Sequence, residues 1–85
     1  MYKLSEDIMI HNENEQKYLV NTETGKVYLL NDIAILIVDG LEGSKSIEEI
    51  KQDIHKQFSN VEYEQISSDV DSYIHMLLQS KALLE

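Results

Sequence analysis

The residue types that most often carry chemistry are few in this chain, and they are poorly grouped. None of its three histidines, His11, His55 and His75, is four residues from another, which is the spacing of a two-histidine zinc site on a helix. Asp71 and His75 are four apart and could hold a metal ion or form a local ion pair, and we expect the ion pair because no further ligands accompany them. Because the chain has no cysteine, it has no thiolate site and no disulfide. The sequence predicts neither a metal nor a cofactor.

Signals of acid–base or nucleophilic catalysis are equally weak. Asp69 is the carboxylate that would lie beside the apolar stripe of a helix, and an acid–base role for it is the enzymatic alternative. Ser67 and Ser68 have no evident base and lack the Gly-x-Ser-x-Gly surroundings of a nucleophile elbow. Asp71-Ser72-Tyr73 is similar to the attachment site of small acidic carrier proteins, but Ser72 would lie inside a helix rather than at its start. We therefore expect a binding protein and not an enzyme.

The charge of the chain restricts its partners. Its formal net charge is -9, from 16 acidic residues against seven lysines and no arginine. Such a chain repels phosphates, so we expect it to bind no nucleic acid. The acidity either keeps the protein in solution or attracts a basic partner, and composition does not decide between the two. No apolar run approaches the roughly 20 residues that span a membrane, and no signal peptide is visible, so the sequence predicts a cytoplasmic protein with no membrane partner.

The elements that would position a site begin with three strands. A chain of 85 residues forms one domain, here residues 1–85, because two cores would each bury too little apolar surface. Short β-rich runs at Ile8–His11, Lys17–Val20 and Lys26–Leu30 are separated by polar turns, the second of which ends in Gly25. Such close neighbours in sequence indicate an antiparallel meander.

Three helices are expected to follow the strands. Asn31 is a good N-cap for the first helix, which glycines are expected to stop within Asp39–Gly43. Ser46 and Glu49 match a capping box at the start of the second, and the third is predicted to run from about Glu64 to Lys81, with the terminal leucines folding back on the core. The predicted fold is therefore α+β and winged-helix-like, a three-stranded antiparallel sheet followed by three helices.

Two of these elements could form a binding surface. The third strand would end the meander, and an edge strand satisfies its free main-chain groups most easily by pairing with another strand. The apolar face of the third helix is wider than one core contact requires, so that one flank could face a groove; the alternative is that the whole face is core. That face holds Ile66, Val70, Tyr73 and Leu77, with Ile74 and Leu78 on one flank and Met76 and Asp69 on the other.

The order and spacing of several short motifs resemble those of the PqqD-like family over nearly the whole chain. The members of this family are recognition elements of pathways that make ribosomally synthesised, post-translationally modified peptides. The motifs are Leu30-Asn31-x-x-Ala34-x-x-Ile37, Asp39-Gly40, Ser46-Ile47-x-Glu49-Ile50, Phe58, Asp69-Val70-x-x-Tyr73-Ile74-x-x-Leu77 and Leu83-Leu84.

The resemblance implies a function and a site. In such domains the leader segment of a precursor peptide binds as an added strand beside the third strand, in a cleft closed by the third helix. Carried over, the peptide-binding residues are Lys26, Val27, Tyr28, Leu29, Leu30, Ile66, Asp69, Val70, Tyr73 and Leu77. The partners implied are the precursor leader peptide, a leader peptidase and other maturation enzymes, with the lasso-peptide type favoured. A PqqD-type chaperone for a radical enzyme and a winged-helix domain for nucleic-acid or protein interaction are the alternatives.

Overall fold

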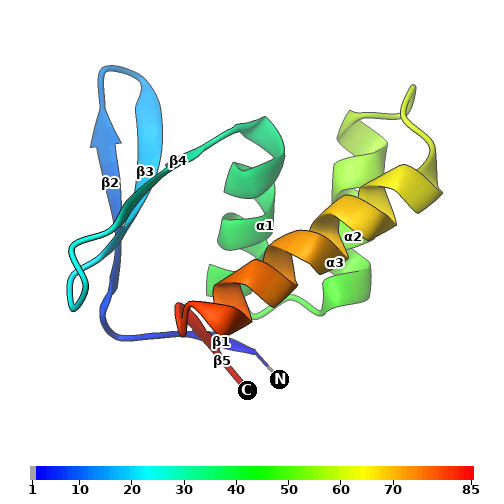
Figure 1. Cartoon of the computed structure of the whole chain (residues 1–85). Coiled ribbons are helices and arrows are strands. Elements are labelled where there is room, and N and C mark those ends of the chain that lie inside the picture. Colours follow the sequence, from blue (N-terminus) through cyan, green and yellow to red (C-terminus); the bar gives the residue numbers. More distant parts are fainter. Residues whose placement is uncertain (1) are drawn as a thin grey trace.

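The computed structural model describes residues 2–85 (Figure 1). It consists of a small sheet, a pair of short terminal strands and three helices. The strands are β1 (Lys3–Leu4), β2 (Ile8–Glu13), β3 (Gln16–Asn21), β4 (Val27–Leu30) and β5 (Leu83–Leu84), and the helices are α1 (Asp32–Glu42), α2 (Ile47–Gln57) and α3 (Tyr63–Gln79). The predicted α+β fold is confirmed, and its element order is compatible with the winged-helix description.

The main sheet is antiparallel, with strand order β2-β3-β4. Its register places Leu19 of β3 between Ile10 of β2 and Tyr28 of β4, on the face toward the helices. The turn before β4 is held by Asn21, whose side-chain oxygen accepts hydrogen bonds from the amides of residues 23 and 24, and by Gly25 at a φ of 79°. A residue with a side chain is strained at that φ, so Gly25 fixes where β4 begins.

The two ends of the described chain pair with each other. Lys3 lies opposite Leu84 and Leu4 opposite Leu83 in the antiparallel β1–β5 pair, and the Leu83 side chain is buried. The predicted return of the terminal leucines to the core is thereby confirmed for Leu83, whereas Leu84 is exposed and β1 was not predicted. The third helix ends at Gln79, before the predicted Lys81, because Lys81 has a φ of 61° that turns the chain toward β5.

Local capping positions the helices as the sequence predicts, with one exception. The Ala34 amide donates to the side chain of Asn31 at 2.8 Å, and Ser46 forms the capping box. The expected stop within Asp39–Gly43 is confirmed at Gly43, the C-cap, whereas Gly40 lies inside the helix, which continues to Glu42. The reason for a glycine there is tertiary: a β-carbon on Gly40 would lie 2.5 Å from Cγ1 of Ile50 in α2. Gly40 therefore permits the close approach of the first two helices.

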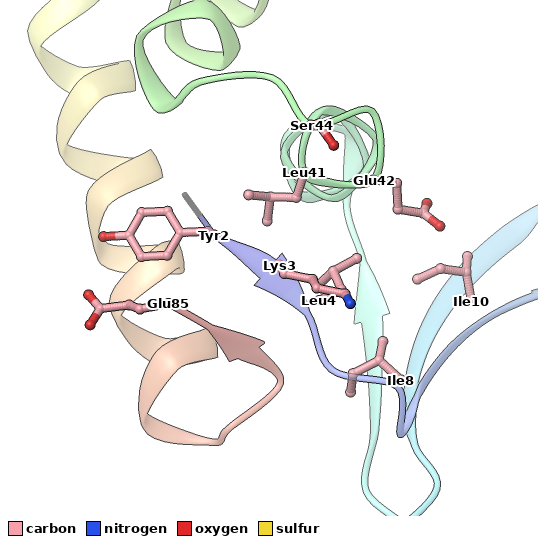
Figure 2. Close-up of a pocket in the computed structure, with 9 residues that line it drawn as sticks. All are labelled: Tyr2, Lys3, Leu4, Ile8, Ile10, Leu41, Glu42, Ser44 and Glu85. Carbon is pink, nitrogen blue, oxygen red and sulfur yellow. The ribbon is translucent and has the colours of Figure 1, made fainter.

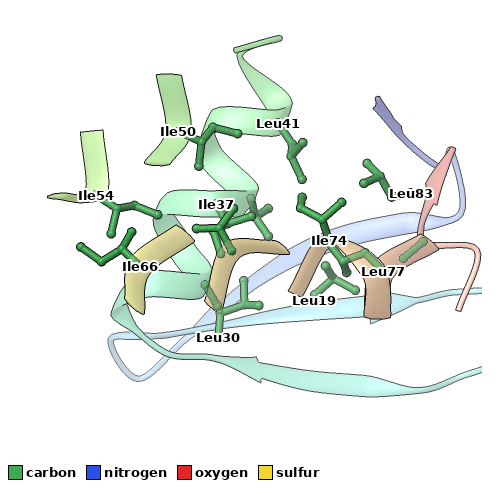
Figure 3. Close-up of a cluster of buried hydrophobic side chains, with 14 residues drawn as sticks. Leu19, Leu30, Ile37, Leu41, Ile50, Ile54, Ile66, Ile74, Leu77 and Leu83 are labelled. Carbon is green, nitrogen blue, oxygen red and sulfur yellow. The ribbon is translucent and has the colours of Figure 1, made fainter. Parts of the chain in front are cut away.

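The core lies among the three helices and against the inner face of the sheet, and its buried residues come from β3, β4, the three helices, Ala82 and β5 (Figure 3). Its fully buried larger side chains are Leu19, Ile37, Val38, Ile50, Ile54, Ile66, Val70, Leu77 and Leu83. This core holds β4 and α3 in place against the rest of the molecule, so the candidate surface described below is supported by packing and not by loops.

An ion pair between Lys51 and Asp71 links α2 to α3, whereas the sequence indicated a pair between Asp71 and His75. Nζ of Lys51 lies 2.9 Å from Oδ1 of Asp71, and the Lys51 side chain is only 9% exposed. The predicted pairing of Asp71 with His75 is therefore wrong, because Asp71 reaches across to the neighbouring helix. The hydrogen bond that Lys51 donates to Asp71 raises the pKa of Lys51, against the opposing effect of burial. Within residues 2–85 no three acidic or histidine side chains come together as a metal site, and none of the described helices has the length and hydropathy to cross a membrane.

Candidate functional site

The free edge of β4 follows from the order of strands. Within the described chain β4 has β3 as its one neighbour, and the Asn21 amide donates to the Lys26 carbonyl at 2.9 Å. In an antiparallel ladder, bonded and non-bonded pairs alternate, so Tyr28 directs its main-chain groups toward β3. The N–H and C=O groups of Val27 and Leu29 must then point away from the sheet. They form a template to which another strand can pair.

The side chains of β4 divide between two faces of the sheet. Val27 and Leu29 are 57% and 59% exposed on the outer face of the sheet. Tyr28 is partly buried and packs against the core, and Leu30 is buried at 4% exposure. Lys26 is exposed just before the strand. An added strand would thus lie beside apolar side chains on both faces.

The α3 part of the predicted surface needs correction. Ile66 and Val70 are 0% exposed and Leu77 is 1% exposed, so their side chains belong to the core and offer no contact to a peptide in this conformation. Helical periodicity identified the apolar stripe but does not tell which of its flanks is covered. Their contribution is to pack α3 into the core, where Figure 3 shows Ile66 and Leu77.

Two partly buried tyrosines belong to the predicted surface, Tyr28 on β4 and Tyr73 on α3, and both pack against the core. Burial raises the pKa of Tyr73, and the phenol of Tyr28 adds a smaller contribution in the same direction. Met76, one turn beyond Tyr73, is also partly buried against the core. The peptide-binding residues implied by the resemblance do not include Met76, although its position three residues after Tyr73 indicates the same flank.

Asp69 lies on this flank as well, but its surroundings do not suit acid–base chemistry. The side chain is exposed, and its Oδ1 accepts a hydrogen bond from Nε2 of Gln65 at 2.9 Å. An exposed carboxylate held by an amide is well solvated, and nothing apolar encloses it. What the arrangement offers is a row of free main-chain groups, two exposed apolar side chains and a tyrosine pair, which suit an extended peptide.

Comparison with known proteins gives a family match and two structural likenesses. The family described as coenzyme PQQ synthesis protein D (PqqD) matches residues 16–83. Among curated proteins no significant match was found. A structure of TbiB1 in complex with the TbiA(beta) leader peptide has a TM-score of 0.84 at 23% identity, over 95% of this chain and 93% of that one. A lasso peptide synthetase B1 complexed with the leader peptide has a TM-score of 0.85 at 23% identity, over 99% and 98% of the two chains.

Proposed function

The chain belongs to the PqqD family, and on that premise we propose that it binds the leader segment of a ribosomally made precursor peptide and presents it to maturation enzymes. The observation that carries the proposal is the free edge of β4, with the main-chain groups of Val27 and Leu29 directed outward. Support comes from the two solved structures of the same fold, each of which is a complex with a leader peptide.

The bound leader is an added strand next to β4. Its main chain pairs with Val27 and Leu29, which supplies affinity with little demand on sequence. Side chains on one face of the leader meet Tyr28 and Tyr73, and those on the other lie beside the exposed Val27 and Leu29 side chains. Selectivity therefore comes from alternate leader positions, and apolar residues fit best on both faces.

The protein acts by presentation and performs no chemistry of its own. Asp69, the side chain that an enzymatic mechanism would use, is solvated and exposed. The lasso-peptide type is favoured because both structural relatives bind leader peptides and one is named a lasso peptide synthetase B1. The description of the matching family favours a second candidate, a PqqD-type partner in cofactor synthesis, which would use the same surface for a different client.

A nucleic-acid role fits the charge of the fold poorly. In a winged-helix domain the third helix would enter the groove of DNA, yet α3 carries Asp69 and Asp71 and contains no lysine or arginine. Neutralising phosphates is the main source of such affinity, and an acidic helix opposes it. Salt-sensitive binding of random duplex DNA at micromolar concentration would contradict this reading.

The test is a titration of the purified protein with the leader of the precursor peptide encoded beside its gene. Tyr73→Ala should weaken binding by about 5- to 150-fold, since an anchoring side chain contributes roughly 1–3 kcal/mol. Tyr63→Ala is the matched control: Tyr63 lies on the same helix but donates its hydroxyl to Glu48 of α2, away from β4. Fluorescence anisotropy measures affinity, and circular dichroism confirms folding.

Three results would count against the proposal. If the leader does not bind the folded parent protein at all, leader recognition is wrong. If Tyr73→Ala and Tyr63→Ala both bind like the parent while folded, the leader occupies another surface. Turnover of the precursor by the purified protein alone would show that it is an enzyme.

A further inference from the structure

A second surface lies at the opposite edge of the same sheet. A hollow of about 760 Å³ opens between β1, β2 and the end of α1 (Figure 2). Its apolar lining comes from Leu4, Ile8, Ile10 and Leu41, of which Leu41 is buried and the others are partly buried. The proposed leader site uses none of these residues, so the hollow has no assigned occupant.

The adjoining strand has free main-chain groups. Within the described chain β2 has β3 as its one neighbour, and the Thr22 amide donates to the Asp7 carbonyl at 2.8 Å. By the alternation of antiparallel pairs, Met9 and His11 direct their main-chain groups toward β3, while those of Ile10 and Asn12 point outward. No described residue bonds these outward groups. The inward side chain of Ile10 enters the hollow, so one strand on this edge could satisfy the main chain and fill the hollow together (Figure 2).

The charges around the hollow indicate which kind of partner binds there. The hollow is bordered by Glu42 and Glu85 against the single cation Lys3, on a chain of net charge -9. A second copy of this chain is disfavoured, because two such chains repel and the β2 sequence IMIHNE brings no lysine to the rim. A small apolar molecule would leave the outward groups of Ile10 unpaired. A partner segment with both apolar and basic side chains fits best, because the apolar ones pack on the apolar lining and the basic ones lie near Glu42 and Glu85.

We propose that the free edge of β2 and the adjoining hollow bind an extended, apolar and basic segment of a partner protein, which adds as a fourth strand. This site is independent of the proposed leader function, because it uses the opposite edge of the sheet. With both edges occupied, the protein holds two chains on one sheet at the same time.

The test uses two blocked seven-residue peptides, one alternating lysine and valine and one alternating glutamate and valine. Each is titrated into the isotopically labelled protein while backbone amide resonances are recorded. The lysine peptide should shift the amides of Ile10 and Asn12 to saturation, and the glutamate peptide should bind about tenfold more weakly at low salt. Asn12→Pro should abolish the shifts, because it removes an outward donor from an exposed position while the β2–β3 ladder remains. Asn12→Ala is the matched control, because it changes the same exposed side chain and retains the amide.

Each remaining outcome contradicts the proposal. The proposal is wrong if the lysine peptide gives no saturable shift at Ile10 and Asn12, or if its shifts centre on Val27 and Leu29 instead. It is also wrong if both peptides bind with equal affinity, or if folded Asn12→Pro binds the lysine peptide like the parent protein. Dimerisation of the free protein through β2, detected by sedimentation, would assign the edge to a second copy and also overturn it.

Discussion

The main-chain geometry of β4 allows the proposed leader contact to be tested by removing one hydrogen-bond donor. Leu29→Pro deletes an amide that points away from the sheet, so the ladder between β3 and β4 keeps its bonds. Proline is tolerated on edge strands in this orientation, and it restricts the preceding Tyr28 to extended conformations that a strand already has. Leu29→Ala is the matched control, because it shortens the same exposed side chain and retains the amide.

The size of the effect follows from the loss of one donor. A leader carbonyl that meets proline in place of an amide is left unpaired, which costs about 1–3 kcal/mol, or roughly 5- to 150-fold in affinity. Leu29→Ala should cost less, since a side chain that is 59% exposed in the free protein buries limited further area. Tyr28→Pro should instead unfold the domain, because the Tyr28 amide faces β3.

Isothermal titration of each folded variant with the cognate leader measures the difference. The decisive quantity is the ratio of dissociation constants for Leu29→Pro and Leu29→Ala. If that ratio is close to one while both variants keep the parent circular dichroism spectrum, the leader does not pair with the β4 edge.

Three further changes test the packing around the site. Gly40→Ala should lower the free energy of unfolding by about 1–3 kcal/mol in urea, because the added methyl overlaps Ile50 and overpacking outweighs the gain in helix propensity; equal or greater stability would refute this. Asp71→Asn should lower the free energy of unfolding by about 1 kcal/mol at pH 7, because the buried Lys51 loses its charged partner. An unchanged urea midpoint of unfolding would show that Lys51 finds another partner. The folded-state pKa values of Lys51 and Tyr73 are both raised, so the free energy of unfolding should be constant up to about pH 10 and fall above it as these groups lose their protons. Urea titrations from pH 7 to pH 11 measure this trend. A free energy of unfolding that rises with pH would contradict it.

Local signals explain which parts of the fold were predictable. The caps at Asn31 and Ser46 depend on contacts within three residues, so the sequence alone places them. Gly40 was misread because its role depends on Ile50, a residue of another helix. Strand β1 was missed because its two residues are strand only through pairing with β5 at the far end of the chain.

The candidate site was predictable in part for the same reason. The order of strands implied that the third one is an edge, and β4 is indeed an edge strand on which Val27 and Leu29 are exposed. The stripe on α3 was predicted as a surface in residues that prove buried, such as Val70, because periodicity does not show how far the sheet covers a helix. The partial burial of Tyr28 and Tyr73 depends on how β4 and α3 pack against the core, which no local pattern encodes.

The pairing of β1 with β5 has a mechanical consequence. Lys3 and Leu84 are opposite each other at the outer end of that pair, and the chain ends leave the molecule side by side (Figure 1). A force that pulls the ends apart therefore peels the pair open one bond at a time, in place of loading all of its bonds together. The force reaches the β2-β3-β4 sheet only after the pair has opened, so tethering the domain by its ends leaves both sheet edges unstrained under small loads.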